Sequence, residues 1–315
     1  MNPPVHVHNR PAAWPSDWLI PDWPAPPCVR AVCTTRTRTI ARTGGVSRSP
    51  YDSLNLGDHV GDDPRDVAAN RLFFEQALGV TPVFLKQVHG QDVLHVRSAS
   101  QGGQVTDVCD VADAAWSDQS GVACTVLVAD CLPLLLTTRS GGWVAAVHVG
   151  WRGLDGLDGS DQCDGKGILE QVCQVIKSKM PVNQAQFATD AIAWLGPCIG
   201  PTAFEVGPDV HAALTRHRPQ AAEMFCPVAT VNTVNTVKWR ADLAGLVRQR
   251  LLSLGISQIF GNDSTAQWCT VSQPERFFSH RRDGVSGRLA ASIWLSNPVH
   301  FDFHGYSPHP KRSTR

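Results

Sequence analysis

The sequence of 315 residues lacks any excess of charge of one sign, because its basic and acidic residues balance to a formal net charge of +0. Nucleic-acid binding needs a basic excess or a basic stripe, and binding to an anionic membrane needs a similar excess. The chain also has no apolar run near the roughly 18 residues that a membrane-spanning helix requires. The sequence therefore argues against nucleic acid and membrane as partners.

Paired cysteines and glycine-rich phosphate-binding motifs are also missing. The ten cysteines form no Cys-x-x-Cys pair, which favours reduced, buried thiols over the disulfides of a secreted scaffold. The first residues contain no apolar core of signal-peptide length, so we expect a cytoplasmic protein. No Gly-x-Gly-x-x-Gly follows a strand-like run, and neither a Walker motif nor Gly-x-Ser-x-Gly occurs. The sequence therefore does not support nucleotide binding through a dinucleotide-binding or Walker motif, nor serine hydrolase chemistry.

Strand and helix signals alternate along the chain without a regular βαβ rhythm, which predicts a mixed fold. Residues 1–27, rich in proline and tryptophan, indicate a loose tail whose later part, from Trp18 to Trp23, packs on the body. A helix is expected from Pro64 to Leu78, with Asp63 as N-cap and Gly79 as C-cap. Other helices are expected at 168–180, 208–216 and 242–254, and strands at 29–37, 82–87, 92–96, 110–116, 121–128, 191–195, 256–260 and 287–295.

The segment 153–167 combines five glycines with regularly spaced aspartates. The aspartate spacing of three differs from the spacing of two in a calcium loop. We expect a mobile surface loop, with weak cation binding as the alternative. The aspartates concerned are Asp155, Asp158, Asp161 and Asp164.

The stretch 128–153 holds two apolar runs on either side of a polar turn that ends in two glycines. Each run carries one side chain that binds metals: Cys131 in the first and His148 in the second. A strand, a turn and a second strand would bring these two side chains together. Catalytic zinc takes three protein ligands and keeps a fourth position open, and His89 is the best-placed third ligand.

The same residues support a second interpretation without metal. Cys131 would then be a nucleophile with His148 as its base and Asp130 or Gln87 nearby, which describes a cysteine hydrolase or amidase. Spacing does not separate the two, and a buried structural thiol remains a third possibility. Several arginines stand in loop-like contexts, where their guanidinium groups could bind phosphate or carboxylate or could form surface ion pairs. These are Arg36, Arg152, Arg281 and Arg282.

Eight motifs occur in order between about Arg36 and Leu295, and together they resemble the bacterial YfiH family, also called the laccase-domain or multicopper polyphenol oxidase family. The motifs are GGVS (44–47), SLNLG (53–57), LKQVHG (85–90), ADCLP (129–133), HVGWRG (148–153), LGPCIG (195–200), FEVG (204–207) and FSHRRD (278–283). The resemblance implies an α+β fold (mixed α/β), a layered sandwich of mixed β-sheets flanked by helices. Residues 28–297 would form a single catalytic domain between the tails 1–27 and 298–315.

The resemblance also implies one zinc ion held by His89, Cys131 and His148, with copper as a possible substitute because a His₂Cys site binds copper too. It implies small-molecule substrates: phosphorolysis of adenosine, inosine and methylthioadenosine to free base and ribose 1-phosphate, with adenosine deamination. Family members have also been described as peptidoglycan-precursor amidases and copper-dependent polyphenol oxidases. A multicopper cluster needs many histidines, whereas the His-x-His pair here, His6 and His8, lies in the proline-rich tail.

Within this resemblance we assign further residues by their place in the motifs. Asp130 and Gln87 would move protons or orient water, and Arg152 is the first candidate to hold phosphate. Substrate or phosphate would also contact Arg36, Asn55, His280 and Arg281. The sequence departs from the family at Val149, where alanine is usual, and at His280, where tyrosine is common. The segment 154–167 is longer than usual and would be a lid or an insertion.

Overall fold

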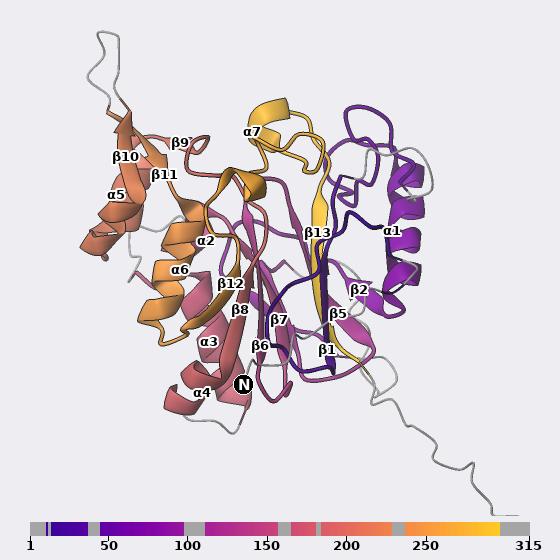
Figure 1. Cartoon of the computed structure of the whole chain (residues 1–315), viewed down its shortest axis with the longest axis horizontal. Coiled ribbons are helices and arrows are strands. Elements are labelled where there is room, and N and C mark those ends of the chain that lie inside the picture. Colours follow the sequence, from indigo (N-terminus) through magenta and orange to yellow (C-terminus); the bar gives the residue numbers. More distant parts are fainter. Residues whose placement is uncertain are drawn as a thin grey trace, which may run out of the picture.

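Two β-sheets stacked face to face form the centre of the molecule, and helices cover both outer faces (Figure 1). The computed structural model describes residues 11, 14–36, 45–97, 111–156, 165–180, 184–228 and 237–296. The four-stranded sheet has the order β1 (Val29–Cys33), β13 (Leu289–Leu295), β5 (Val122–Val128) and β2 (Thr81–Val83). The six-stranded sheet has the order β12 (Gln258–Gly261), β8 (Ala191–Leu195), β6 (Leu132–Thr138), β7 (Val144–Val149), β4 (Ala114–Ser117) and β3 (Val93–His95).

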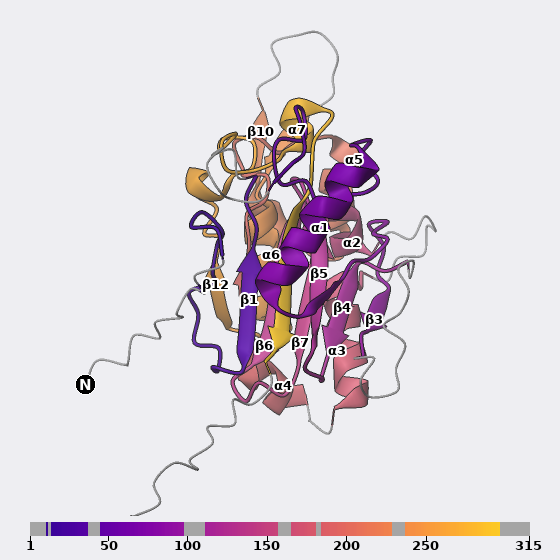
Figure 2. The same cartoon turned by 90° about the vertical axis from the view of Figure 1, so that its right-hand side faces the viewer.

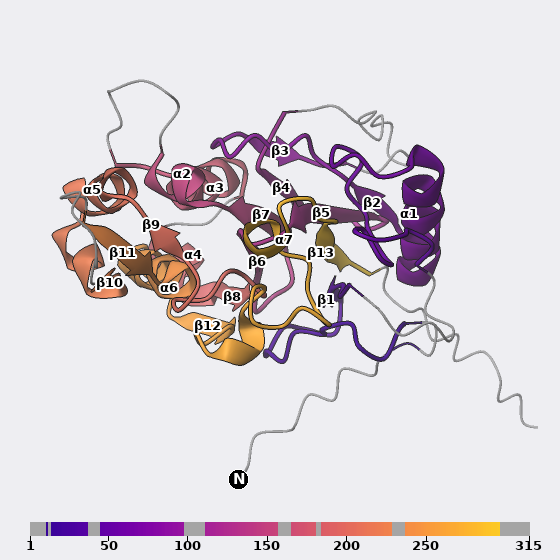
Figure 3. The ribbon, with the colours of Figure 1, turned by 90° about the horizontal axis from the view of Figure 1, so that it is seen from above.

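The helices divide between the two outer faces. Seen from above, α1 (Pro64–Leu78) covers the four-stranded sheet, and helices on the other side cover the six-stranded sheet (Figure 3). The latter are α2 (Trp151–Asp155), α3 (Ile168–Lys179), α4 (Gln184–Asp190) and α6 (Leu243–Ser253). Helix α5 (Pro208–Arg216) lies farther out with a small sheet of β10 (Phe225–Val228), β11 (Lys238–Ala241) and β9 (Glu205–Val206). This architecture confirms the expected sandwich of mixed sheets flanked by helices.

Successive side chains along a strand point to opposite faces of the sheet, so they pack in different apolar clusters. Leu134 and Val147 pack with the helices beside the six-stranded sheet, whereas Leu135 and Ala146 pack toward the four-stranded sheet. His148 has the same parity as Ala146, so its side chain emerges on the side between the sheets, at the end of β7. The short helix α7 (His280–Asp283) lies over this end of the strands (Figures 1 and 3).

The N-terminal segment is anchored by tryptophans, as expected for its later part. Trp18 is 1% exposed and contacts the rings of Phe73 and Phe74 on α1. Trp14 is also buried, and its indole Nε1 donates to the carbonyl of Ala77 at 2.7 Å. The segment thereby closes one flank of the four-stranded sheet and α1 (Figure 2).

The caps of α1 confirm the sequence prediction, since the Asp63 side chain accepts from the backbone of Arg65 and Gly79 ends the helix in the left-handed region. Other predictions are wrong in part, and one of them is the strand expected at 29–37, which ends at Cys33. The strand expected at 82–87 spans Thr81–Val83, and after it Lys86 forms an isolated bridge with Val111 instead of continuing the strand. The segment 153–167 begins inside helix α2, and Asp155 is buried rather than exposed.

Several expected features fall outside the described residues. These are the aspartates Asp158, Asp161 and Asp164, the pair His6 and His8, and the C-terminal segment 298–315. Helix α4 and strands β10 and β11 are present although no pattern in the sequence predicted them. No helix among the described residues is long and apolar enough to cross a membrane.

Candidate metal centre

The β6–β7 hairpin brings Cys131 and His148 together, as the two apolar runs predicted. In the antiparallel register, Leu132 pairs with Val149 and Pro133 with His148. Cys131, directly before β6, therefore lies beside the end of β7. One ligand atom each from Cys131, His148 and His89 lies within 4.8 Å of the other two.

His89 reaches this point through a tight turn. Its backbone has a φ of 63°, in the left-handed region. Its imidazole lies edge-on to that of His148, with ring centroids 4.8 Å apart. Its Nε2 is 3.6 Å from the sulfur of Cys131. The two rings and the sulfur therefore converge on one small volume.

Asp113 organises this turn and the ring of His148. Three consecutive backbone N–H groups, those of Val88, His89 and Gly90, donate to its carboxylate at 3.1, 2.9 and 2.7 Å. His148 donates from Nδ1 to the same carboxylate at 2.7 Å, so Nε2 is the nitrogen that could bind a metal. Burial opposes ionisation of Asp113, but the bonds to His148 and the backbone outweigh it and lower the pKa of the carboxyl.

Sequence reasoning did not single out Asp113. Its signal is a lone acid between Ala112 and Ala114 at the start of a buried strand, where an ionised group needs dedicated partners. The carboxylate is fully buried and its four donors account for its position.

Gly150 allows α2 to begin directly beside the cluster. A Cβ at this position would lie 2.8 Å from Cδ2 of His89 and 3.2 Å from the sulfur of Cys131. Only a residue without a side chain fits between the hairpin and the His89 turn. The glycine after His148-Val149 is thus explained by close packing at the centre.

The charges of the cluster suit a metal ion. Burial alone would raise the pKa of the Cys131 thiol, but His148 and His89 outweigh it and lower the pKa to about 6. Burial likewise opposes the charge of His148, yet Cys131 and Asp113 raise the pKa of this imidazole to about 9. A thiolate beside two imidazoles, one of them held by a buried carboxylate, is a donor set that fits zinc.

The three side chains line a cavity of about 380 Å³. A volume of this size is typical of small-molecule sites. Its other lining residues are apolar, polar or charged: His59, Gln87, Leu127, Ala129, Asp130, Gly150, Trp151, Ile199, Phe204, Leu243, His280, Arg281 and Arg288.

Asp130 and Gln87 line the cavity, but their polar groups are engaged elsewhere. Asp130 accepts from the hydroxyl of Thr270 and from the backbone N–H of Arg281, both at 2.6 Å. The amide of Gln87 bonds at both ends to the backbone of Leu127, at 2.8 and 2.7 Å. These contacts fix α7 and the end of β5 around the cavity.

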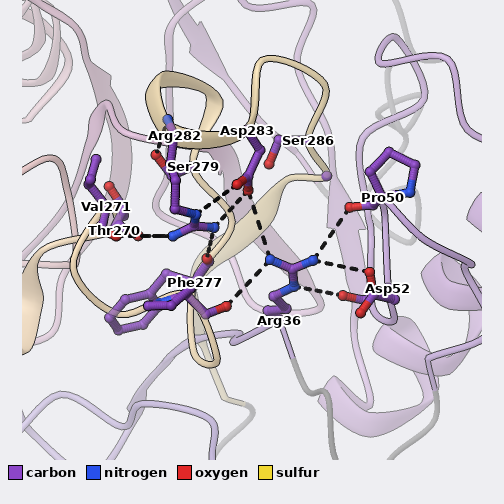
Figure 4. A network of polar contacts seen from close by, with 12 residues as sticks. Arg36, Pro50, Asp52, Thr270, Val271, Phe277, Ser279, Arg282, Asp283 and Ser286 are labelled. Carbon is purple, nitrogen blue, oxygen red and sulfur yellow. Dashed lines mark hydrogen bonds and ion pairs between the residues drawn. The ribbon is translucent and has the colours of Figure 1, made fainter.

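Three other residues assigned from the motifs are not among those lining the cavity. Arg152 is exposed and lies over the ring of Trp151. Arg36 is 5% exposed and bonds to Asp52 and to the carbonyls of Pro50 and Pro274, with Asp283 3.8 Å away (Figure 4). Asn55 is fully buried.

His280 and Arg281, also assigned from the motifs, do line the cavity, together with His59 and Arg288, which sequence reasoning missed. Arg281 bonds through Nη1 to the carbonyl of Glu205 at 3.0 Å. Arg288 directly precedes β13, and its position in the sequence carries no signal beyond an arginine next to a glycine. Only the return of β13 to the centre of its sheet places it here.

Comparisons with known proteins agree on one family. The family model described as multi-copper polyphenol oxidoreductase laccase matches residues 36–296. Purine nucleoside phosphorylase YfiH of Shigella flexneri is 42% identical over 282 residues, covering 89% of this chain and 99% of that protein. A purine nucleoside phosphorylase of Pseudomonas aeruginosa is 41% identical over 280 residues, covering 89% and 99%.

Solved structures agree with these relatives. A crystal structure of a Neisseria meningitidis protein has a TM-score of 0.71 and 39% identity, covering 90% of this chain and 100% of that one. A second, of YlmD from Geobacillus stearothermophilus, has a TM-score of 0.67 and 29% identity, covering 86% and 93%. On these grounds the chain belongs to the YfiH family of laccase-domain proteins.

Proposed function

We propose that this protein is a zinc-dependent purine nucleoside phosphorylase. It would convert adenosine, inosine or methylthioadenosine and phosphate into the free base and ribose 1-phosphate, and it would also deaminate adenosine. The observation that carries the proposal is the convergence of His89, Cys131 and His148 in a cavity that also presents two arginines. The names of the relatives from Shigella flexneri and Pseudomonas aeruginosa support the substrate class.

His89, Cys131 and His148 would hold the zinc ion, which when bound would supply Lewis-acid activation of a substrate oxygen or of water. Asp113 keeps His148 in one tautomer and orientation through the bond to Nδ1. The low pKa of Cys131 provides the thiolate that metal binding requires. These residues prepare the site before substrate enters.

The remaining walls suit the two parts of a nucleoside reaction. Trp151, Ile199, Phe204 and Leu243 form an apolar surface on which a flat base can pack. Arg281 and Arg288 provide positive charge for an anionic co-substrate. The cavity thus offers a base-binding wall, a metal-binding cluster and a basic wall around one volume.

The direct test is incubation with adenosine, with and without phosphate, followed by product analysis. We expect adenine release that depends on phosphate, inosine formation without phosphate, and about one zinc ion per chain in purified protein. Cys131→Ala should lose both zinc and turnover. Full activity in metal-free protein would contradict the zinc mechanism.

A second candidate is an amidase acting on a peptidoglycan precursor. The observation that favours it is the pairing of a thiol of lowered pKa with His148, whose own pKa is raised, because this arrangement activates a cysteine nucleophile. Neither adenine nor inosine in the assay, together with amide cleavage that survives metal removal, would select this candidate. Copper at the same three residues, with phenol oxidation, is the third possibility.

A further inference from the structure

Arg288 stands apart from the other arginines near the cavity in what its guanidinium contacts. Its Nη1 donates to the carbonyls of Ser286 and Gly287 at 2.8 and 3.0 Å. Among the described residues no carboxylate lies within ion-pair distance of its guanidinium, although Arg288 is half-buried and the charge of Asp130 acts on it from farther away. By contrast, Arg36 and Arg282 both lie close to the carboxylate of Asp283 (Figure 4), at 3.8 and 2.7 Å.

Arg288 lines the cavity together with the metal-binding cluster. Burial lowers the pKa of Arg288, and the nearby negative charges of Cys131 and Asp130 act in the opposite direction. The carboxylate of Asp130 is already occupied by Thr270 and by the backbone of Arg281. A half-buried cation with unused donors is a binding site for an anion.

The segment 53–57 holds Arg288 in place. The side-chain oxygen of Asn55 accepts from the backbone N–H of Arg288 at 2.8 Å, and Leu56 donates to the carbonyl of Arg288 at 3.2 Å. Gly57 lies flat against the side chain, since a Cβ there would be 2.7 Å from Cγ of Arg288. Asn55, which sequence reasoning assigned to substrate binding, therefore positions the backbone of Arg288.

We propose that Arg288 binds inorganic phosphate in the phosphorylase reaction, with Arg281 as the second cation of the same subsite. The inference rests on the proposed function. A phosphate oxygen forms the bond to C1′ of the ribose as the bond from C1′ to the purine nitrogen breaks. The base leaves with the electron pair and takes the proton of hydrogen phosphate. Arg288 holds the phosphate on the side of the cavity that also contains Cys131.

The kinetic test compares Arg288→Gln and Arg288→Lys with Arg65→Gln, a matched change at an exposed arginine on α1. Losing a charge-assisted hydrogen bond should raise the KM for phosphate about 10- to 100-fold in Arg288→Gln. Arg288→Lys should give a smaller increase, because lysine keeps the charge without the fork. The KM for adenosine and the zinc content should stay as in the unchanged protein.

Gly57→Ala provides an independent variant that keeps the guanidinium and displaces its stem. It should also raise the KM for phosphate without changing zinc content. If instead the KM for adenosine rises while that for phosphate is unchanged in either Arg288 variant, Arg288 contacts the nucleoside and the inference is wrong. If Arg288→Gln does not fold, Arg288→Lys and Gly57→Ala decide the question by the same measurement.

A binding measurement separates this inference from the proposed function. Phosphate should raise the melting temperature of the unchanged protein more than acetate or chloride at equal ionic strength, and Arg288→Gln should lose most of that increase. An equal effect of acetate would indicate a site for a substrate carboxylate and would overturn the phosphate assignment. Absence of phosphorolysis with phosphate stabilisation intact would reject the proposed function and retain the anion site.

Discussion

The residue that most controls the candidate centre is Asp113, which belongs to none of the eight motifs. Its carboxylate connects the turn that carries His89 to the ring of His148. A buried carboxylate with four donors fixes the two histidines relative to each other. The geometry of the cluster thus depends on a side chain that does not face the cavity.

Asp113→Asn tests this dependence. The asparagine side chain accepts hydrogen bonds only through its oxygen, and its NH2 group would face at least one of the N–H donors that bond Asp113. The His89 turn and the His148 ring should therefore loosen. We expect zinc affinity to fall roughly 10- to 100-fold, as is typical for partners of metal-binding histidines. Competition with a chelating dye measures it.

Asp118→Asn is the matched control for Asp113→Asn. Asp118 also bonds a histidine, His95, at 3.0 Å, but the pair lies at the surface, away from the cavity. Zinc affinity should be unaffected in this control. Equal affinities for Asp113→Asn and unchanged protein would show that the turn holds its shape without the carboxylate.

Among the elements, helix α2 matters most for the centre, because it starts at the end of β7 and presents Trp151 to the cavity. Its far end is held by Arg250, which donates from Nη2 to the carbonyl of Leu154 and from Nη1 to Glu170 on α3. Gln91 donates to the carbonyl of Gly156, just after the helix. The helix is therefore fixed at both ends.

Gly150→Ala tests the near end of α2. The added methyl group would collide with His89 and Cys131, so the helix or the ligands must shift and zinc affinity should fall about tenfold or more, within the range seen for disturbed ligand supports. Gly142→Ala, in the turn of the same hairpin, is the control, since its nearest neighbour would be 3.7 Å away. Zinc titration of both variants measures the difference, and a normal affinity for Gly150→Ala would contradict this account of the packing.

Arg250→Ala tests the far end. The side chains of Arg250 and Glu170 are 4% and 12% exposed, so removing the arginine leaves a buried carboxylate with less compensation. Loss of one partner of a buried pair costs about 3–5 kcal/mol, which urea unfolding should report as reduced stability. Lys238→Ala breaks an exposed pair with Glu205 and should leave the urea midpoint unchanged. A small effect of Arg250→Ala would mean that Arg218, which also bonds Glu170, compensates.

At the scale of the whole molecule, the two stacked sheets form a core that does not include the cluster of His89, Cys131 and His148. The apolar residues between the sheets come from β1, β5, β13 and the central strands of the six-stranded sheet. The cluster lies at the ends of these strands, where loops from several parts of the chain meet. Zinc should therefore stabilise a fold that already exists.

Chelation tests this separation of fold and centre. Removing zinc should lower the melting temperature by roughly 5–15 °C, the effect of losing a ligand at 100 to 1,000 times its Kd. The far-ultraviolet circular dichroism should stay the same. The Cys131→Ala variant should not respond to the chelator. Loss of secondary structure on chelation would show that the fold itself requires the metal.

Local sequence patterns predicted the helices and strands whose boundaries depend on a few neighbouring residues. Asp63, Pro64 and Gly79 delimit α1 because caps act within one turn, and two apolar runs around Gly141 and Gly142 define the β6–β7 hairpin. The prediction that Cys131 and His148 meet followed from that hairpin alone. His89 entered the same set through spacing and then through its motif.

Only the tertiary structure decided which polar residues serve the cavity. The sequence points to Arg36 and not to Arg288, yet Arg36 is paired with Asp52 and lies near Asp283 of α7, whereas Arg288 lines the cavity. Asp113 meets His148 only when β4 pairs with β7. The sequence by itself determined the ligand types and the hairpin, through interactions between near neighbours. Long-range pairing of strands decided the partners, because a side chain's role follows from what the fold places against it.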